Sequence, residues 1–128
     1  MKVRRDPEDV HPPVATYAHQ VEVRDERLLV LSGQIGMRVG GEVPDDPIEQ
    51  LDVAWDNLDA NLRAAGMCTG DLVKLTVYLV GDIDAGRRRA LLARRLGDHR
   101  PAMTAVAVTG LVAPNLRVEI EAWAARAD

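Results

Sequence analysis

The clearest pattern in the chain is a helical repeat of apolar residues between residues 47 and 65. Asp46 can cap the start of this segment, Pro47 suits the first helical position, and Gly66 is a typical stop. The pattern predicts a helix over 47–65 that buries one face. The apolar side chains recur every three or four positions, at Ile48, Leu51, Trp55, Leu58, Leu62 and Ala65.

A second and weaker helical pattern covers residues 84–96 and ends at Gly97. Ala85, Leu92 and Leu96 align on one stripe, with Leu91 beside them. The pattern predicts a shorter helix. Its first turns also carry three consecutive arginines, at positions 87, 88 and 89.

The other ordered segments have the character of strands. Residues 72–80 alternate, with Leu75 and Val77 on one face and Thr76 and Tyr78 on the other. Four more strands are predicted, over 18–23, 27–33, 102–109 and 116–123. The first two of these, separated by a polar turn, suggest an antiparallel hairpin. The charged residues 1–13 are interpreted as a leader that precedes the first strand.

The predicted order β-β-α-β-α-β-β suits one α+β domain, with both helices on one face of a single sheet. In the last strand Val118 and Ile120 are expected under the helices and Glu119 on the free face. Strand parity places Met103 and Ala105 on the same free face as Glu119. Such small or apolar side chains make a poor solvent face, so we expect this face to be covered by another subunit of a homo-oligomer.

Composition narrows the classes of function. The chain has 128 residues, enough for one domain (1–128) with a buried core. Its net charge of −4 and its 3% aromatic content argue against nucleic acid as a partner, because such proteins usually carry a basic excess and aromatic stacking platforms.

The single cysteine, Cys68, can form neither an intrachain disulfide nor a metal cluster by itself. No apolar run approaches the length of a membrane span, and the first nine residues are mostly charged. We therefore expect a cytoplasmic protein without a membrane partner.

Five segments together resemble the RidA (YjgF/UK114) family over residues 14–125. Residues 31–35 read LSGQI, and residues 71–79 read DLVKLTVYL, close to the family's DVVKxTVFL. Residues 118–122 read VEIEA, as in the family. Asn57 and Leu58 with the later Ala-Ala-Gly match a helix end, and Pro101-Ala102 opens the family's PARS strand. Each segment alone is weak, but all five occur in the expected order.

The resemblance implies a chorismate-mutase-like single domain with two helices on one face of a mixed sheet. It also implies a homotrimer whose sheets line a central interior, with a small-molecule cleft at each subunit interface. Archetypal members hydrolyse enamines and imines to ketoacids and ammonia. They use no metal and no bound cofactor, so none is expected here.

The resemblance also suggests roles for single residues. Glu119 would be the catalytic residue that orients a water; the alternative is a solvated or interface carboxylate paired with Arg117. Tyr17 would contact a ligand at the cleft mouth, or is simply a packed tyrosine with a wet hydroxyl. Ser32 and Gly33 would line the cleft with their backbone, or form an ordinary strand end.

Met103 stands where the family's PARS arginine binds the substrate carboxylate. Thr104 and Ala105 follow it and would contact the ligand with it. Methionine carries no charge, so the bidentate clamp is absent from this position. Arg89, or with less support Arg100, could supply a relocated clamp; the alternative for Arg89 is a solvated helix face.

The sequence therefore favours a hydrolase or deaminase acting on an imine, enamine or related metabolite, with a substrate unlike that of archetypal members. An apolar Met103 suggests a less acidic or a bulkier ligand. The alternative is a non-catalytic metabolite-binding or chaperone-like trimer. A ribonuclease role has been attached to relatives, and the acidic charge balance argues against it here.

Overall fold

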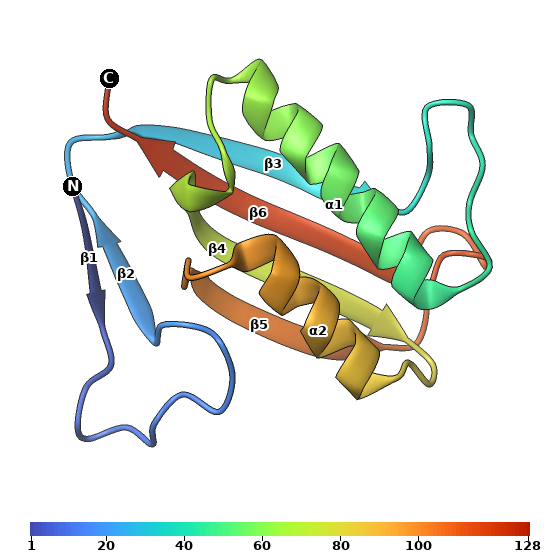
Figure 1. Cartoon of the computed structure of the whole chain (residues 1–128), viewed down its shortest axis with the longest axis horizontal. Helices are drawn as coiled ribbons and strands as arrows, with labels where there is room; N and C mark the ends of the chain where they lie inside the picture. The colour runs from blue at the N-terminus through green and yellow to red at the C-terminus, as the bar shows by residue number, and fades with distance from the viewer.

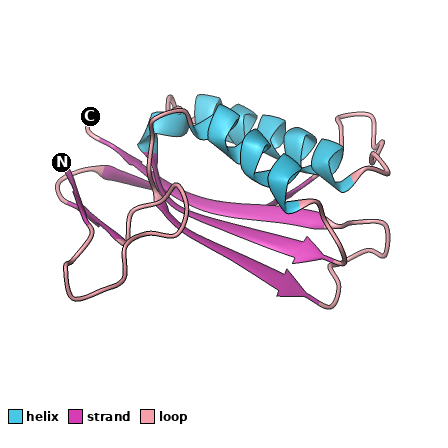
Figure 2. Cartoon of the chain, turned by 60° about the horizontal axis from the view of Figure 1, so that its bottom comes forward, coloured by secondary structure: helices cyan, strands magenta, loops and turns pink.

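Two helices lie side by side on one face of a four-stranded mixed sheet in the computed structural model, which describes residues 1–128 (Figures 1 and 2). This confirms the predicted α+β class and the placing of both helices on one face. In chain order the elements of this layer are β3 (Arg27–Ile35), α1 (Pro47–Ala64), a 3-10 turn (Thr69–Asp71), β4 (Leu72–Val80), α2 (Ala85–Leu96), β5 (Ala102–Val108) and β6 (Val118–Arg126).

Both helices begin and end where the local sequence indicates. The Asp46 carboxylate accepts a hydrogen bond from the backbone N–H of Ile48 at 3.0 Å, which caps α1. Asp84 accepts from the N–H of Arg87 at 2.9 Å and caps α2. Gly97 ends α2 with φ of +58°, a conformation that glycine adopts without a Cβ penalty. The two predicted helices are confirmed.

The hydrophobic core lies between the helices and the two central strands. The strand order is β3-β6-β4-β5, with β4 parallel to β5 and antiparallel to β6. Leu75 and Val77 of β4 are fully buried beneath the helices, as is Ile120 of β6. They pack in one cluster with Trp55 and Leu58 of α1. The predicted apolar faces of β4 and β6 are therefore correct.

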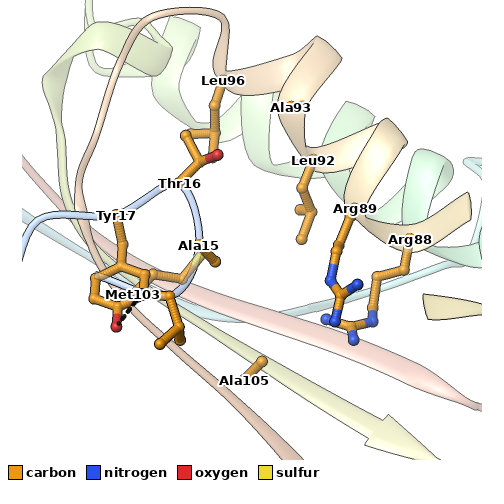
Figure 3. A pocket seen from close by; sticks show the side chains of 11 residues that line it. Ala15, Thr16, Tyr17, Arg88, Arg89, Leu92, Ala93, Leu96, Met103 and Ala105 are labelled. Atoms are coloured by element: carbon orange, nitrogen blue, oxygen red, sulfur yellow. Dashed lines mark hydrogen bonds between the residues drawn. The ribbon is translucent and has the colours of Figure 1, made fainter. Parts of the chain in front are cut away.

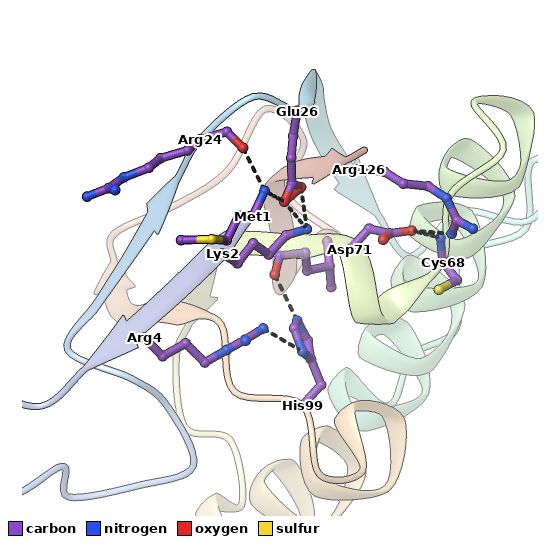
Figure 4. Close-up of polar contacts among 10 residues, drawn as sticks. Met1, Lys2, Arg4, Arg24, Glu26, Cys68, Asp71, His99 and Arg126 are labelled. Atoms are coloured by element: carbon purple, nitrogen blue, oxygen red, sulfur yellow. Dashed lines mark hydrogen bonds and ion pairs between the residues drawn. The ribbon is translucent and has the colours of Figure 1, made fainter. Parts of the chain in front are cut away.

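The predicted hairpin between 18–23 and 27–33 is wrong. The strand β2 (Gln20–Val23) instead pairs antiparallel with β1 (Lys2–Arg5), a strand formed by part of the supposed leader. The charges that suggested a leader stabilise this ribbon. Arg5 contacts the Glu22 carboxylate at 3.0 Å. Lys2 contacts the Glu26 carboxylate at 2.7 Å, as Figure 4 shows. The chain thus has a separate two-stranded sheet beside the main one.

The predicted facing of β5 is also wrong. Met103 lies opposite Leu75 in the parallel β4–β5 pair, so it faces the helices. Ala105 lines a cavity with residues of α2. Glu119 lies opposite Tyr78 and faces the other way. Ala105 and Ala107, on the helix side of this edge strand, remain exposed.

The helix-free face nevertheless exposes apolar side chains, although not the predicted ones. Val30 of β3 and Trp123 of β6 are cross-strand partners and are 57% and 46% exposed. Leu28 and Val106, on the same face, are 58% and 38% exposed. Clustered exposed apolar residues of this kind are typical of interaction surfaces. Neither helix combines the length and hydropathy needed to span a membrane.

Candidate functional site

The larger cavity lies between α2, the first half of β5 and the loop before β2 (Figure 3). Its volume is about 560 Å³, and no acidic side chain lines it. Its lining combines an apolar wall with two arginines: Val14, Ala15, Thr16, Tyr17, Arg88, Arg89, Leu92, Ala93, Leu96, Met103 and Ala105. A mostly apolar hollow with a few convergent polar groups is the usual form of a small-molecule site.

Tyr17 lines this cavity because backbone pairing holds its loop against the start of β5. The backbone N–H of Ala18 donates to the Pro101 carbonyl at 3.2 Å, and Ala18 forms a parallel bridge with Ala102. The Tyr17 hydroxyl accepts from the Val14 N–H at 3.1 Å. Its own proton therefore remains free to donate to a ligand.

Arg89 lines the cavity, as does Arg88, which sequence reasoning missed. Neither guanidinium makes a hydrogen bond or ion pair with the protein, and Nε of Arg88 is excluded from solvent without a partner. Arg87, in contrast, contacts Asp46 at 2.7 Å. Arg100 does not line the cavity. The sequence alone could not show that these three adjacent arginines have different environments, because the environments depend on how α2 packs on the sheet.

A smaller cavity of about 300 Å³ lies on the helix-free face. It is lined by Gly33, Tyr78, Val108, Gly110, Leu111, Glu119 and Glu121. The pairing of β3 with β6 skips from Leu31 to Gln34, so Ser32 and Gly33 form an irregularity beside this cavity. The Glu119 carboxylate occupies the space over Gly33 where a Cβ atom would lie.

The two glutamates of this cavity differ in their contacts. The Tyr78 hydroxyl donates to Oε1 of Glu121 at 2.5 Å, and this bond is the main cause that raises the pKa of Tyr78. Glu119 has no hydrogen bond or ion pair. Its predicted alternative partner, Arg117, instead donates to the carbonyl of Val80 at the end of β4, at 3.0 Å, and to that of Asp82 just beyond it, at 2.7 Å. Glu119 therefore keeps its full capacity to accept hydrogen bonds.

The residues predicted for one site thus fall into three groups within a protomer. The larger cavity contains Tyr17, Arg89, Met103 and Ala105, and the smaller one contains Gly33 and Glu119. Ser32 is exposed and lines neither cavity. Thr104 also lines neither; its hydroxyl accepts from Nζ of Lys74 at 2.7 Å.

His19 and His99 make hydrogen bonds that connect loops to neighbouring backbone. Nε2 of His19 lies 2.7 Å from the His11 carbonyl, and Nε2 of His99 lies 2.8 Å from the Leu72 carbonyl. No group of three or more His, Cys, Asp or Glu side chains is arranged to hold a metal ion.

A family model described as endoribonuclease L-PSP matches residues 8–126. The chain is 31% identical over 119 residues to a RutC family protein of Pyrococcus horikoshii, covering 91% of this chain and 92% of the relative. It is 32% identical over 123 residues to the 2-iminobutanoate/2-iminopropanoate deaminase of Escherichia coli, covering 93% and 94%.

Solved structures agree with the sequence matches. A Rid family protein from Yersinia pestis superposes with a TM-score of 0.86 at 31% identity, covering 96% of this chain and 97% of the other. Escherichia coli TdcF with bound serine gives 0.72 at 28% identity, covering 90% and 91%. The fold defines a small α+β protein of the class that these solved structures represent. The chain belongs to the RidA (YjgF/UK114) family, as the sequence motifs predicted.

Proposed function

We propose that the protein hydrolyses an imine or enamine, with Glu119 positioning the attacking water. The observation that carries this proposal is the Glu119 carboxylate, which lies over Gly33 without any partner in the protein. Relatives of similar length are named 2-iminobutanoate/2-iminopropanoate deaminases, from Escherichia coli and mouse. A free carboxylate beside a cavity is the group that such a reaction needs.

The chemistry requires only water and proton transfers. The water oxygen adds to the carbon of the C=N bond as Glu119 accepts a water proton, and the nitrogen takes up a proton. The resulting carbinolamine then loses its C–N bond. The nitrogen leaves as ammonia and the carbon becomes the carbonyl of a keto product. One water is consumed for each imine, and no electrons are transferred.

The proposed site needs more than one subunit. Glu119 and Met103 lie on opposite faces of the same sheet, so one protomer cannot bring them to one ligand. A homotrimer in which the helix-free face of one subunit meets the larger cavity of the next would do so. The exposed apolar side chains of Val30 and Trp123 on the helix-free face support this arrangement.

Specificity is proposed to differ from that of archetypal deaminases. Met103 presents a thioether where the family resemblance implies a guanidinium, and Leu92 and Leu96 continue the apolar wall. Of the two expectations drawn from Met103, the cavity favours a bulkier ligand over a less acidic one, because Arg88 and Arg89 keep it positively charged.

A direct assay follows imine hydrolysis with a panel of imines generated by an amino-acid oxidase, using semicarbazide to trap the imine that escapes the enzyme. We expect turnover by the wild type and a loss of about 100-fold or more for Glu119→Gln. Glu42→Gln, an exposed carboxylate in the turn before α1, is the matched control and should leave turnover unchanged.

Unchanged turnover in Glu119→Gln would contradict the assigned role. Ligand binding without turnover across the whole panel would favour the alternative, a metabolite-binding trimer. Hydrolysis of 2-iminopropanoate as fast as by an archetypal deaminase would contradict the proposed difference in specificity.

A further inference from the structure

The arginines of α2 fall into distinct electrostatic environments. Arg87 contacts Asp46 at 2.7 Å, and Arg95 contacts three aspartates of α1, the nearest at 2.6 Å. Arg88 and Arg89 have no such partner, and these are the two that line the larger cavity. In Figure 3 both side chains descend from α2 on the same side of the cavity, near Ala105.

Water can satisfy the donors of Arg89, which is exposed, but solvation does not account for Arg88, which is only partly exposed. Arg94 is also unpaired, but it is exposed on the outer side of the same helix and water can satisfy its donors. Nε of Arg88 is excluded from water and has no acceptor in the protein. A buried donor without a partner is uncommon, and each case calls for an explanation such as a ligand. The missing acceptor would come from whatever occupies the cavity.

We propose that Arg88 and Arg89 form a two-guanidinium subsite for a ligand that carries two negative charges. With imine hydrolysis as the reaction, the ligand class is the imine of a dicarboxylic amino acid; this inference rests on the proposed function. An imine derived from an ordinary amino acid has one carboxylate and would leave one cation uncompensated. A second carboxylate matches the second guanidinium, and guanidinium groups bind carboxylates in planar bidentate pairs.

In this subsite the ligand carboxylates are bound by side chains of α2 and not by a side chain of β5. The β5 position that would carry a charged clamp is Met103, which faces the same cavity. The positive charge is supplied from α2 instead, above the apolar wall formed by Leu92 and Leu96. The carbon chain between the two carboxylates would lie against this wall, and the Tyr17 hydroxyl is free to donate to a ligand oxygen.

Two measurements on the full chain test the subsite. The first is the calorimetric binding of 2-oxoglutarate against 2-oxobutanoate, the stable keto products of a dicarboxylic and a monocarboxylic imine. We expect the dicarboxylate to bind at least about tenfold more tightly. Arg88→Gln and Arg89→Gln should each remove most of that preference, while the matched control Arg94→Gln keeps it. The second measurement repeats the comparison with the corresponding imines, where the variants should raise KM and leave kcat nearly unchanged.

The possible outcomes distinguish failure of the proposed subsite from failure of the proposed function. Arginine-dependent binding of 2-oxoglutarate without turnover of any imine would support the subsite and overturn the proposed function. Turnover with equal affinity for the two keto acids, or a preference that survives in Arg88→Gln/Arg89→Gln, would overturn the subsite alone. Tighter binding of inorganic phosphate than of 2-oxoglutarate, lost in the double variant, would overturn the dicarboxylate assignment.

Discussion

Gly33 and Glu119 occupy complementary space across the β3–β6 pair. A Cβ atom built at Gly33 would lie 2.0 Å from Oε1 of Glu119 and 2.8 Å from its Cδ. No real side chain tolerates such contacts, so the absence of a side chain at residue 33 is what lets the carboxylate rest there. Gly33 of the SGQI segment therefore leaves the space that the proposed catalytic carboxylate occupies.

Gly33→Ala should reduce imine turnover with little loss of stability. The atoms in conflict belong to the far end of the Glu119 side chain, which can swing away. We expect the free energy of unfolding to change by less than about 1 kcal/mol. Turnover should fall at least about tenfold, because the carboxylate no longer lies where water is positioned. Urea unfolding and the imine assay measure the two effects separately.

Gly36→Ala is the contrasting control for this experiment. A Cβ atom there would lie 2.5 Å from the backbone carbonyl oxygen of Gln50 in α1, which cannot move aside as a side chain can. We expect this variant to lose roughly 1–3 kcal/mol of stability and to keep normal turnover per folded molecule. The opposite pattern in the two variants would contradict the role given to Gly33.

Stability should fall on mild acidification because of His99. Burial is the main cause that lowers the pKa of this histidine; the hydrogen bond to the Leu72 carbonyl opposes it as the next largest effect, and the nearby Arg4 and Lys2 lower the pKa further. Nδ1 of His99 lies 3.2 Å from the Arg4 guanidinium, which must donate, and Nε2 faces the Leu72 carbonyl (Figure 4). The folded protein therefore holds a neutral imidazole, protonated on Nε2.

The sign of the effect follows from this lowered pKa. As pH falls through about 6.5, the histidine of the unfolded chain takes up a proton before that of the folded chain. The stability present above this pH is then lost progressively until the folded pKa is passed, at no more than about 1.4 kcal/mol per pH unit. Urea unfolding between pH 8 and 5 should show this loss. His99→Gln retains a donor for Leu72 and should abolish it; an equal slope in the variant would contradict the assignment.

Arg95 should be the most important charged residue for the packing of α2 on α1. Its guanidinium contacts Asp52 at 2.6 Å, Asp56 at 2.7 Å and Asp59 at 3.4 Å, and its side chain is only 21% exposed. Arg95→Gln should cost roughly 1–2 kcal/mol of stability, with a smaller loss at high salt. Arg94→Gln, on the exposed side of the same helix, should cost almost nothing. Equal losses in chemical denaturation would mean that the aspartates contribute no specific stabilisation.

The sequence predicted those features that depend on local signals. The helices were found because Asp46, Asp84 and Gly97 mark their ends within a few residues of the apolar stripes. The β1–β2 ribbon is not predicted by local signals because its paired residues are 15 to 21 positions apart in sequence. Their pairing depends on contacts such as Arg5 with Glu22, which charge composition alone does not reveal.

The facing of β5 could not be predicted from its own residues. Met103, Ala105 and Ala107 alternate with Thr104, Val106 and Val108, so neither set is clearly polar. Only the register with β4, which places Met103 beside Leu75, identifies the buried face. The same limit explains why Arg88 was missed and why the candidate site appeared to lie on one face of the sheet.

The helix-free face should be the contact that assembles the proposed trimer. Val30 and Trp123 are cross-strand neighbours there, 57% and 46% exposed. Val30→Glu places a carboxylate against Trp123, and burying an unpaired charge in a subunit contact is costly. We expect the wild type to sediment as a trimer and Val30→Glu as a monomer. Turnover should be lost in the variant, because Glu119 and Met103 reach one ligand only across two subunits.

Val39→Glu is the control for this last experiment, since Val39 is fully exposed in the turn before α1. It adds the same charge at a site away from the sheet and should remain trimeric and active. A stronger test mixes Glu119→Gln with Arg88→Gln/Arg89→Gln after mild dissociation. The assay uses a dicarboxylic imine at a concentration far below the KM of the arginine variant, where both parents turn over slowly. Mixed trimers would contain some clefts with an intact glutamate facing intact arginines, so turnover should exceed that of either parent. An active Val30→Glu monomer, or mixing without recovery, would show that the site is complete within one chain.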